Sequence, residues 1–139
     1  MKKNNRQKKS EELRIDFEKL NTVMGFDVIP VVVQDVNTKE LLMLAYANEK
    51  ALNRTIEIGF ATFLSTSRKK LWLKGETYGC LLKVVEIRVN CEQNSLLYLV
   101  IPTKGIGVCH TQDEAGENRK TCFYRSIKKM KTKIISEKI

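Results

Sequence analysis

A chain of 139 residues, 42% of them hydrophobic, can form one compact domain with a buried core but is too short for two ordinary domains. Its formal net charge of +9 at pH 7 sits at the two ends, because residues 1–10 carry five cations and no acid, and residues 128–139 carry five lysines and one glutamate. We therefore expect a single neutral domain over residues 11–127, flanked by solvated basic tails, and no nucleic-acid partner.

The compartment decides how the cysteines are interpreted. No apolar stretch reaches the roughly 20 residues that a membrane-crossing helix needs, so we expect a cytoplasmic location and no membrane partner. In a reducing cytoplasm, cysteines favour metal binding over a disulfide framework. The chain has four of them: Cys80, Cys91, Cys109 and Cys122. Zinc is therefore the leading cofactor.

Two short helices are predicted. The first covers residues 10–20, where apolar residues recur at helical spacing. These are Leu13, Phe17 and Leu20. The second begins after Asn48, a suitable N-cap, and ends at Gly59, a suitable stop. Its apolar face is expected to hold Ala51, Leu52 and Ile56.

The rest of the domain is predicted to be rich in strands. Apolar and β-branched runs predict strands over residues 28–33, 41–46, 61–64, 71–73, 81–89 and 95–101. A polar turn at 35–39 makes the first two a hairpin. In the fifth, Val85, Ile87 and Val89 alternate with polar residues, which indicates one buried face. Residues 104–125 show no periodicity and are predicted to be a loop, so the pattern by itself indicates a β-rich mixed domain.

Three of the cysteines have positions that suit a catalytic metal. Cys91, Cys109 and Cys122 lie at predicted strand or loop edges and form no CxxC pair of the kind found in zinc ribbons. A zinc ion with three protein ligands keeps its fourth position open for water, which then ionises near neutral pH and becomes a strong nucleophile. Spacing alone leaves an alternative equally open, in which the cysteines are buried thiols without a ligand.

Six segments carry a resemblance to a known family. They are residues 31–35 (VVVQD), 42–46 (LMLAY) with 48–49 (NE), 65–68 (STSR), 71–77 (LWLKGET), 109–111 (CHT) and 122–125 (CFYR). Their sequence and order resemble the motifs of the phosphoribosyl-AMP cyclohydrolases. The resemblance extends from about residue 25 to residue 127, which is nearly the whole chain between the tails.

The resemblance implies a fold, an assembly and a reaction. The fold would be α+β, with mainly antiparallel strands and two short helices, in an intertwined homodimer. Zinc would lie at the subunit interface, bound by Cys91, Cys109 and Cys122 from both chains. The reaction would be a step of L-histidine biosynthesis, in which zinc-activated hydroxide hydrolyses the purine N1–C6 bond of phosphoribosyl-AMP. The product is an opened formimino-carboxamide ribonucleotide.

Further roles follow from the match. His110 is the only histidine, stands beside a matched ligand and has an unperturbed pKa of ~6.5, so we expect it to shuttle a proton; otherwise it packs or supports the zinc site. The expected substrate-binding residues are Arg68, Trp72, Lys74, Glu76 and Thr77. Cations would bind the two phosphates while the indole covers the base. The alternative is a solvated turn with a core tryptophan.

The chain departs from the family pattern in two places. Family members usually have three carboxylates, forming a magnesium site, where this chain has Asn90, Glu92 and Asn94. Amides keep an oxygen but remove negative charge, so magnesium affinity should fall. Twelve residues separate Cys109 from Cys122, about twice the family's usual spacing. Residues 112–120 are expected to form a solvated loop whose acids could offer oxygens to a metal. Cys80 matches no family role and is expected to be a buried thiol.

Two rival functions remain at this point. A zinc-dependent paralogue would open or deaminate another purine-like nucleotide, although residues 71–77 argue against a large change of substrate. A zinc-stabilised module would instead bind nucleic acid through its basic tails, with an affinity that falls steeply with salt.

Overall fold

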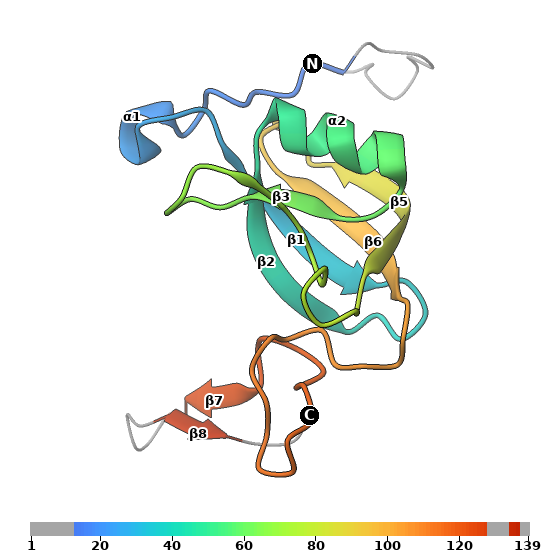
Figure 1. Cartoon of the computed structure of the whole chain (residues 1–139). Helices are drawn as coiled ribbons and strands as arrows, with labels where there is room; N and C mark the ends of the chain where they lie inside the picture. Colours follow the sequence, from blue (N-terminus) through green and yellow to red (C-terminus); the bar gives the residue numbers. More distant parts are fainter. Residues whose placement is uncertain (1–12, 128–133, 137–139) are drawn as a thin grey trace.

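The computed structural model describes residues 13–127 and 134–136 and has an α+β fold (Figure 1). Its centre is a four-stranded sheet with the order β2-β1-β6-β5. These strands are β1 (Ile29–Asp35), β2 (Leu41–Ala47), β5 (Leu82–Val89) and β6 (Leu96–Pro102). The β1–β2 and β5–β6 pairs are antiparallel, whereas β1 and β6 are parallel. The predicted α+β class is confirmed, with one parallel pairing in a mainly antiparallel fold.

The predicted β1–β2 hairpin is confirmed, and Asp35 shapes its turn. One Asp35 carboxylate oxygen accepts hydrogen bonds from the N–H groups of Asn37 (2.8 Å) and Thr38 (3.0 Å). Lys39 then adopts a left-handed conformation, with φ at 67°, and the chain returns as β2. The Asp35 side chain therefore acts as a turn cap, which accounts for a carboxylate that is mostly buried.

Helix α2 (Glu49–Ile58) begins and ends where the sequence predicts. The Asn48 side chain accepts a hydrogen bond from Ala51 N–H (2.8 Å), and Gly59 ends the helix in a left-handed conformation. The prediction that Ile56 lies on the buried face is wrong, because its side chain is 64% exposed. Thr55 takes that place: its hydroxyl donates to Ala51 O and accepts from Thr62 N–H, so its polar group is satisfied in the core.

The predicted first helix is wrong over its described part. Residues 13–16 have no regular structure and residues 17–20 form a turn, and the short helix α1 (Asn21–Met24) comes only afterwards. The N–H groups of Arg14 and Asp16 donate to the side chain and carbonyl of Gln93, respectively. These long-range bonds replace helical ones, and Ile15 and Phe17 still pack against the core. Residues 14–16 are thereby hydrogen-bonded to Gln93, in the turn that follows β5.

A second hairpin and α2 cover one face of the sheet (Figure 1). The hairpin is formed by β3 (Thr62–Leu64) and β4 (Leu71–Leu73), as the sequence predicts. Phe63 is fully buried, and its ring stacks on that of Tyr98 from β6 at a centroid distance of 5.8 Å. This aromatic pair ties the hairpin to the central sheet.

Strand β5 departs from simple alternation. The register against β6 shifts between Val84 and Glu86, which leaves Val85 in a bulge with 45% of its surface exposed. Ile87 and Val89 pack against the core as predicted, but Val84 takes the place expected for Val85. A bulge is invisible to a two-residue period, so the sequence could not reveal it.

The chain ends in a small separate strand pair, β7 (Arg125–Ile127) and β8 (Ile134–Ser136). It lies below the central sheet in Figure 1, beyond the loop that follows β6. Strand β8 falls within the predicted basic tail at 128–139, whereas the predicted tail at 1–10 lies outside the described residues. Within the part of the chain that the structure describes, no helix is long and apolar enough to cross a membrane.

Candidate active site

The segment between Cys109 and Cys122 is a hairpin rather than the expected loose loop. Its two arms pair through Cys109 N–H to Arg119 O (2.9 Å), Arg119 N–H to Thr111 O (3.0 Å) and Asp113 N–H to Glu117 O (2.8 Å). At Gly107 a Cβ atom would lie 1.9 Å from Asn118 O, so only glycine permits this approach. The pairing returns the chain to its starting point, which brings the two cysteines together despite the long insertion.

The acidic side chains of the insertion lie in its turn or on its surface. Asp113 caps the hairpin tip, where its carboxylate accepts from the N–H groups of Ala115 (2.9 Å) and Glu117 (3.0 Å). Glu114 and Glu117 are exposed. The Asp113 carboxylate is therefore used in the turn, and the suggestion that these acids replace metal-binding oxygens gains no support.

Cys109 and Cys122 lie close enough to affect each other's ionisation, and their thiols differ in acidity. Burial acts to raise the pKa of Cys109, but hydrogen bonds from Thr111 and Cys122 and the nearby Lys74 ammonium outweigh it, so that pKa is lowered. Burial, together with the charge of Cys109, raises the pKa of Cys122 to about 11. Cys109 is therefore the first of the two to become a thiolate, which is the form that binds metal.

Cys91 does not reach this pair in one chain. It is exposed in the turn between β5 and β6, at the end of β6 that begins with Leu96, whereas Cys109 follows the other end at Pro102. Seven strand residues, about 20 Å at 3.3 Å per residue, separate the two ends; Figure 1 shows the hairpin below the sheet and this turn at the top. Among the described residues, no three metal-binding side chains gather.

The turn around Cys91 holds the three expected magnesium positions, but they do not fit that ion. The Asn90 amide donates to Asn94 Oδ1 (2.8 Å), and Asn90 Oδ1 accepts from the N–H groups of Asn94 (2.8 Å) and Ser95 (2.9 Å). Asn94 also donates to a Glu92 carboxylate oxygen (3.3 Å). The amide oxygens are thus already engaged within the turn, and Glu92 is left as its one carboxylate.

Lys74 lies buried beside the cysteine pair. Only 4% of it is exposed, and its ammonium donates to the Tyr78 hydroxyl (2.9 Å), which in turn donates to Val108 O. Burial lowers the pKa of Lys74, while the cysteines Cys122, Cys109 and Cys80 act in the opposite direction. Burial also raises the pKa of Tyr78 to about 12, so its phenol remains a donor. Sequence reasoning missed Tyr78, whose only signal is its place four residues after Lys74.

Comparison with known proteins identifies the family. The family model described as Phosphoribosyl-AMP cyclohydrolase matches residues 43–124, which include Lys74 and both cysteines of the hairpin. The chain belongs to the phosphoribosyl-AMP cyclohydrolase family.

Individual relatives agree with this assignment. The phosphoribosyl-AMP cyclohydrolase of Archaeoglobus fulgidus is 54% identical over 100 residues, which are 72% of this chain and 85% of that protein. That of Desulforapulum autotrophicum is 41% identical over 125 residues, 90% of each chain. The histidine biosynthesis bifunctional protein HisIE of Aquifex aeolicus is 49% identical over 100 residues, which cover 72% of this chain and 45% of that longer protein.

The remaining residues expected from the phosphoribosyl-AMP cyclohydrolase resemblance have varied settings. Arg68 is exposed in the β3–β4 turn, and Glu76 and Thr77 are exposed after β4. Trp72 is half-buried, with its ring centroid 5.2 Å from that of Phe63, so part of its surface belongs to the core. His110 is exposed directly after buried Cys109. Their roles toward the substrate stay predictions.

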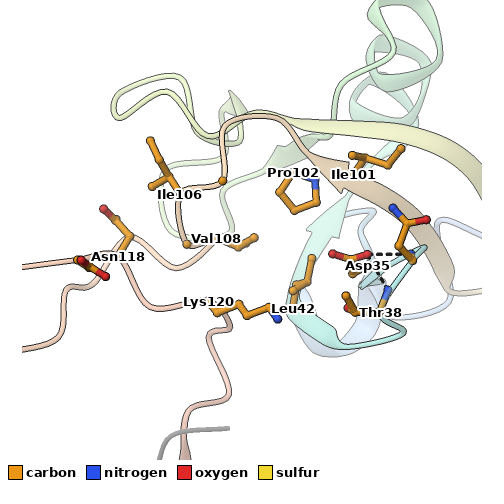
Figure 2. Close-up of a pocket in the computed structure, with 13 residues that line it drawn as sticks. Asp35, Thr38, Leu42, Ile101, Pro102, Ile106, Val108, Asn118 and Lys120 are labelled. Carbon is orange, nitrogen blue, oxygen red and sulfur yellow. Dashed lines mark hydrogen bonds between the residues drawn. The ribbon is translucent and has the colours of Figure 1, made fainter.

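A cavity of about 820 Å³ is lined by both arms of the hairpin, by the β1–β2 turn and by the end of β6 (Figure 2). None of the expected site residues lines it. Lys120 is the one cation among the described lining residues, and its ammonium is paired with Glu40 at 3.0 Å. A phosphoribosyl-AMP cyclohydrolase must bind two phosphates, so this cavity is poorly suited to the substrate.

Proposed function

We propose that the chain hydrolyses the N1–C6 bond of phosphoribosyl-AMP, a step of L-histidine biosynthesis. Membership of the phosphoribosyl-AMP cyclohydrolase family over residues 43–124 carries this proposal. The paired thiols of Cys109 and Cys122 beside buried Lys74 support it, since a hydrolase needs a prepared place for an activated water. A reducing cytoplasm would keep such thiols free.

We further propose that zinc binds at Cys109 and Cys122 and that Cys91 of a second copy completes the site. The donor set fits: two adjacent thiols, one with a lowered pKa, suit zinc, which usually takes four ligands in all. When bound, zinc would supply a Lewis acid that lowers the pKa of a water molecule to near 7.

A two-fold dimer can bring the third cysteine to the pair. If the two-fold axis runs perpendicular to the strands, the two sheets lie antiparallel to each other. The end of one sheet that carries Cys91 then meets the end of the other sheet that carries the hairpin, and the symmetry repeats this contact at the opposite end. The uncovered sheet face offers an apolar surface for such contact. In register across β2, β1 and β6, Leu44, Val32 and Leu97 share a row, and Leu44 is exposed. This geometry supports the predicted homodimer with shared sites.

The reaction requires both a nucleophile and a proton donor. The water oxygen bonds to C6, the N1–C6 bond breaks, C6 becomes a carboxamide carbon and N1 takes up a proton. His110 is exposed beside Cys109 and suits this transfer, because it can accept a proton from the attacking water and return one to N1. Lys74 places its buried amino group beside the sulfurs, while exposed Arg68 remains available for a phosphate.

Magnesium should contribute little to this chain. The hydrogen bond between Asn90 and Asn94 holds the turn together without a metal ion, whereas two carboxylates at these positions would repel each other and need a cation between them. Activity should therefore change less than about twofold across a magnesium titration. An Asn90→Asp, Asn94→Asp double variant should lose about 1–2 kcal/mol of unfolding free energy, because it breaks this bond and crowds carboxylates, and magnesium should restore it. Chemical denaturation with and without magnesium measures this effect.

A matched change separates the turn from a general charge effect. Asn53→Asp alters an exposed asparagine on α2 in the same way and should leave stability unresponsive to magnesium. Strong activation of the wild type by magnesium would contradict the proposed independence.

Substrate choice is tested by assaying phosphoribosyl-AMP beside AMP and adenosine. Turnover of phosphoribosyl-AMP is expected, since the ribose phosphate on N1 makes the ring electron-poor and open to water. Turnover of the simple adenine compounds alone would favour the paralogue.

A further inference from the structure

The second arm of the hairpin places an arginine where it touches both cysteine segments. The Arg119 guanidinium donates to Thr111 Oγ1 (3.1 Å) and to Gln112 O (2.6 Å). Its central carbon lies 4.1 Å from the ring centroid of Tyr124. Thr111 stands two residues after Cys109, and Tyr124 stands two residues after Cys122. One half-buried cation therefore links the two segments that carry the sulfurs.

This contact favours one direction for a hydrogen bond at the sulfur. Thr111 Oγ1 lies 2.9 Å from Cys109 Sγ, a distance at which either atom alone could be the donor. Since Arg119 can only donate, the threonine oxygen accepts from it, and the hydroxyl proton is free to point at the sulfur. The Thr111 N–H approaches the same sulfur at 3.4 Å. As a thiolate, Cys109 Sγ can only accept, so the Thr111 hydroxyl and the Thr111 N–H then both donate to it.

The backbone of Arg119 strengthens this arrangement. Its carbonyl accepts from Cys109 N–H (2.9 Å), and its N–H donates to Thr111 O (3.0 Å), so main chain and side chain hold the same short stretch. Neighbouring Asn118 adds a side-chain bond to Cys109 O (2.9 Å). The guanidinium is held by contacts with Thr111, Gln112 and the Tyr124 ring. Its side chain therefore loses little conformational entropy when a metal ion binds nearby.

We propose that Arg119 is a positioning residue for the cysteine pair: it turns the Thr111 hydroxyl onto Cys109 Sγ and so prepares that sulfur to bind zinc. The inference rests on the proposed metal site. Groups that hydrogen-bond a metal ligand orient it, and their removal commonly weakens metal binding 10- to 100-fold. The insertion that separates the two cysteines thereby gains a function, because its second arm carries this arginine.

The test is zinc affinity of the full-length protein, measured by competition with a chromophoric chelator. Thr111→Val keeps the shape but removes the hydroxyl, and should weaken zinc binding about tenfold. Thr111→Ser restores the hydroxyl and should return affinity to within about twofold of wild type. Arg119→Ala should weaken binding, and the Arg119→Ala, Thr111→Val double variant should bind zinc no more weakly than Thr111→Val alone, because both changes break one chain of contacts.

Controls separate positioning from general damage. Arg54→Ala removes an exposed arginine paired with Glu57 on α2 and should leave zinc affinity unchanged. Equal affinities of Thr111→Val and wild type, or losses that add in the double variant, would overturn the proposal even if Arg119→Ala is unstable. A wild type that binds zinc but does not hydrolyse phosphoribosyl-AMP would instead refute the proposed function and leave this inference standing.

Discussion

A heterodimer of one Cys91→Ala subunit and one Cys109→Ser subunit is expected to regain about half of wild-type activity, although neither variant is active alone. Each proposed site takes Cys91 from one chain and the Cys109–Cys122 pair from the other. In the mixed dimer, one site loses two ligands and the second keeps all three. Co-expression with two different affinity tags isolates the mixed dimer, whose hydrolysis rate and zinc content are then measured.

The matched control combines two changes within the hairpin. A heterodimer of Cys109→Ser and Cys122→Ser subunits has a damaged pair on each chain, so both of its sites lack a sulfur and it should stay inactive. An inactive Cys91→Ala/Cys109→Ser heterodimer would contradict the shared site, since a site built from one chain is broken in both of those subunits.

Within a single variant, the largest effect is expected at Cys109. Cys109→Ser should lose most bound zinc and at least about a thousandfold in hydrolysis rate, because a neutral hydroxyl is a poor zinc ligand and an unactivated water is a weak nucleophile. Zinc content by elemental analysis and initial rates measure the two effects together.

Cys80 provides the internal comparison for the same chemical change. It is fully buried, its thiol donates to Ile106 O (3.2 Å), and burial raises its pKa. A serine at this position can make the same hydrogen bond, so Cys80→Ser should retain zinc and most activity. Equal losses in the two variants would show that fold damage, rather than ligand loss, explains the result at Cys109.

The sequence predicted elements whose signals are local. The cap and stop of α2 need only Asn48 and Gly59, and the β1–β2 hairpin needs only its turn. Long-range contacts defeated the same reasoning elsewhere. The N–H groups of Arg14 and Asp16 donate to Gln93 instead of forming helical hydrogen bonds, and a bulge exposes Val85. Each depends on a partner strand or turn that a local pattern does not contain.

The candidate site divides in the same way. Cys109 and Cys122 lie near each other, but the hairpin that brings them together needs the close approach at Gly107, which spacing could not reveal. Lys74 was expected to face phosphate, and its burial against Tyr78 follows from tertiary packing. Family resemblance proved to be the strongest guide to function, because its motifs are shared along most of the matched chain.

The most direct test of the account is hydrolysis of phosphoribosyl-AMP by the purified wild-type protein, beside Cys109→Ser, with bound zinc measured in both. We expect the zinc-loaded wild type to convert the substrate to the opened formimino-carboxamide ribonucleotide, and the variant to be nearly inert. A zinc-loaded wild type that leaves phosphoribosyl-AMP unchanged would contradict the account.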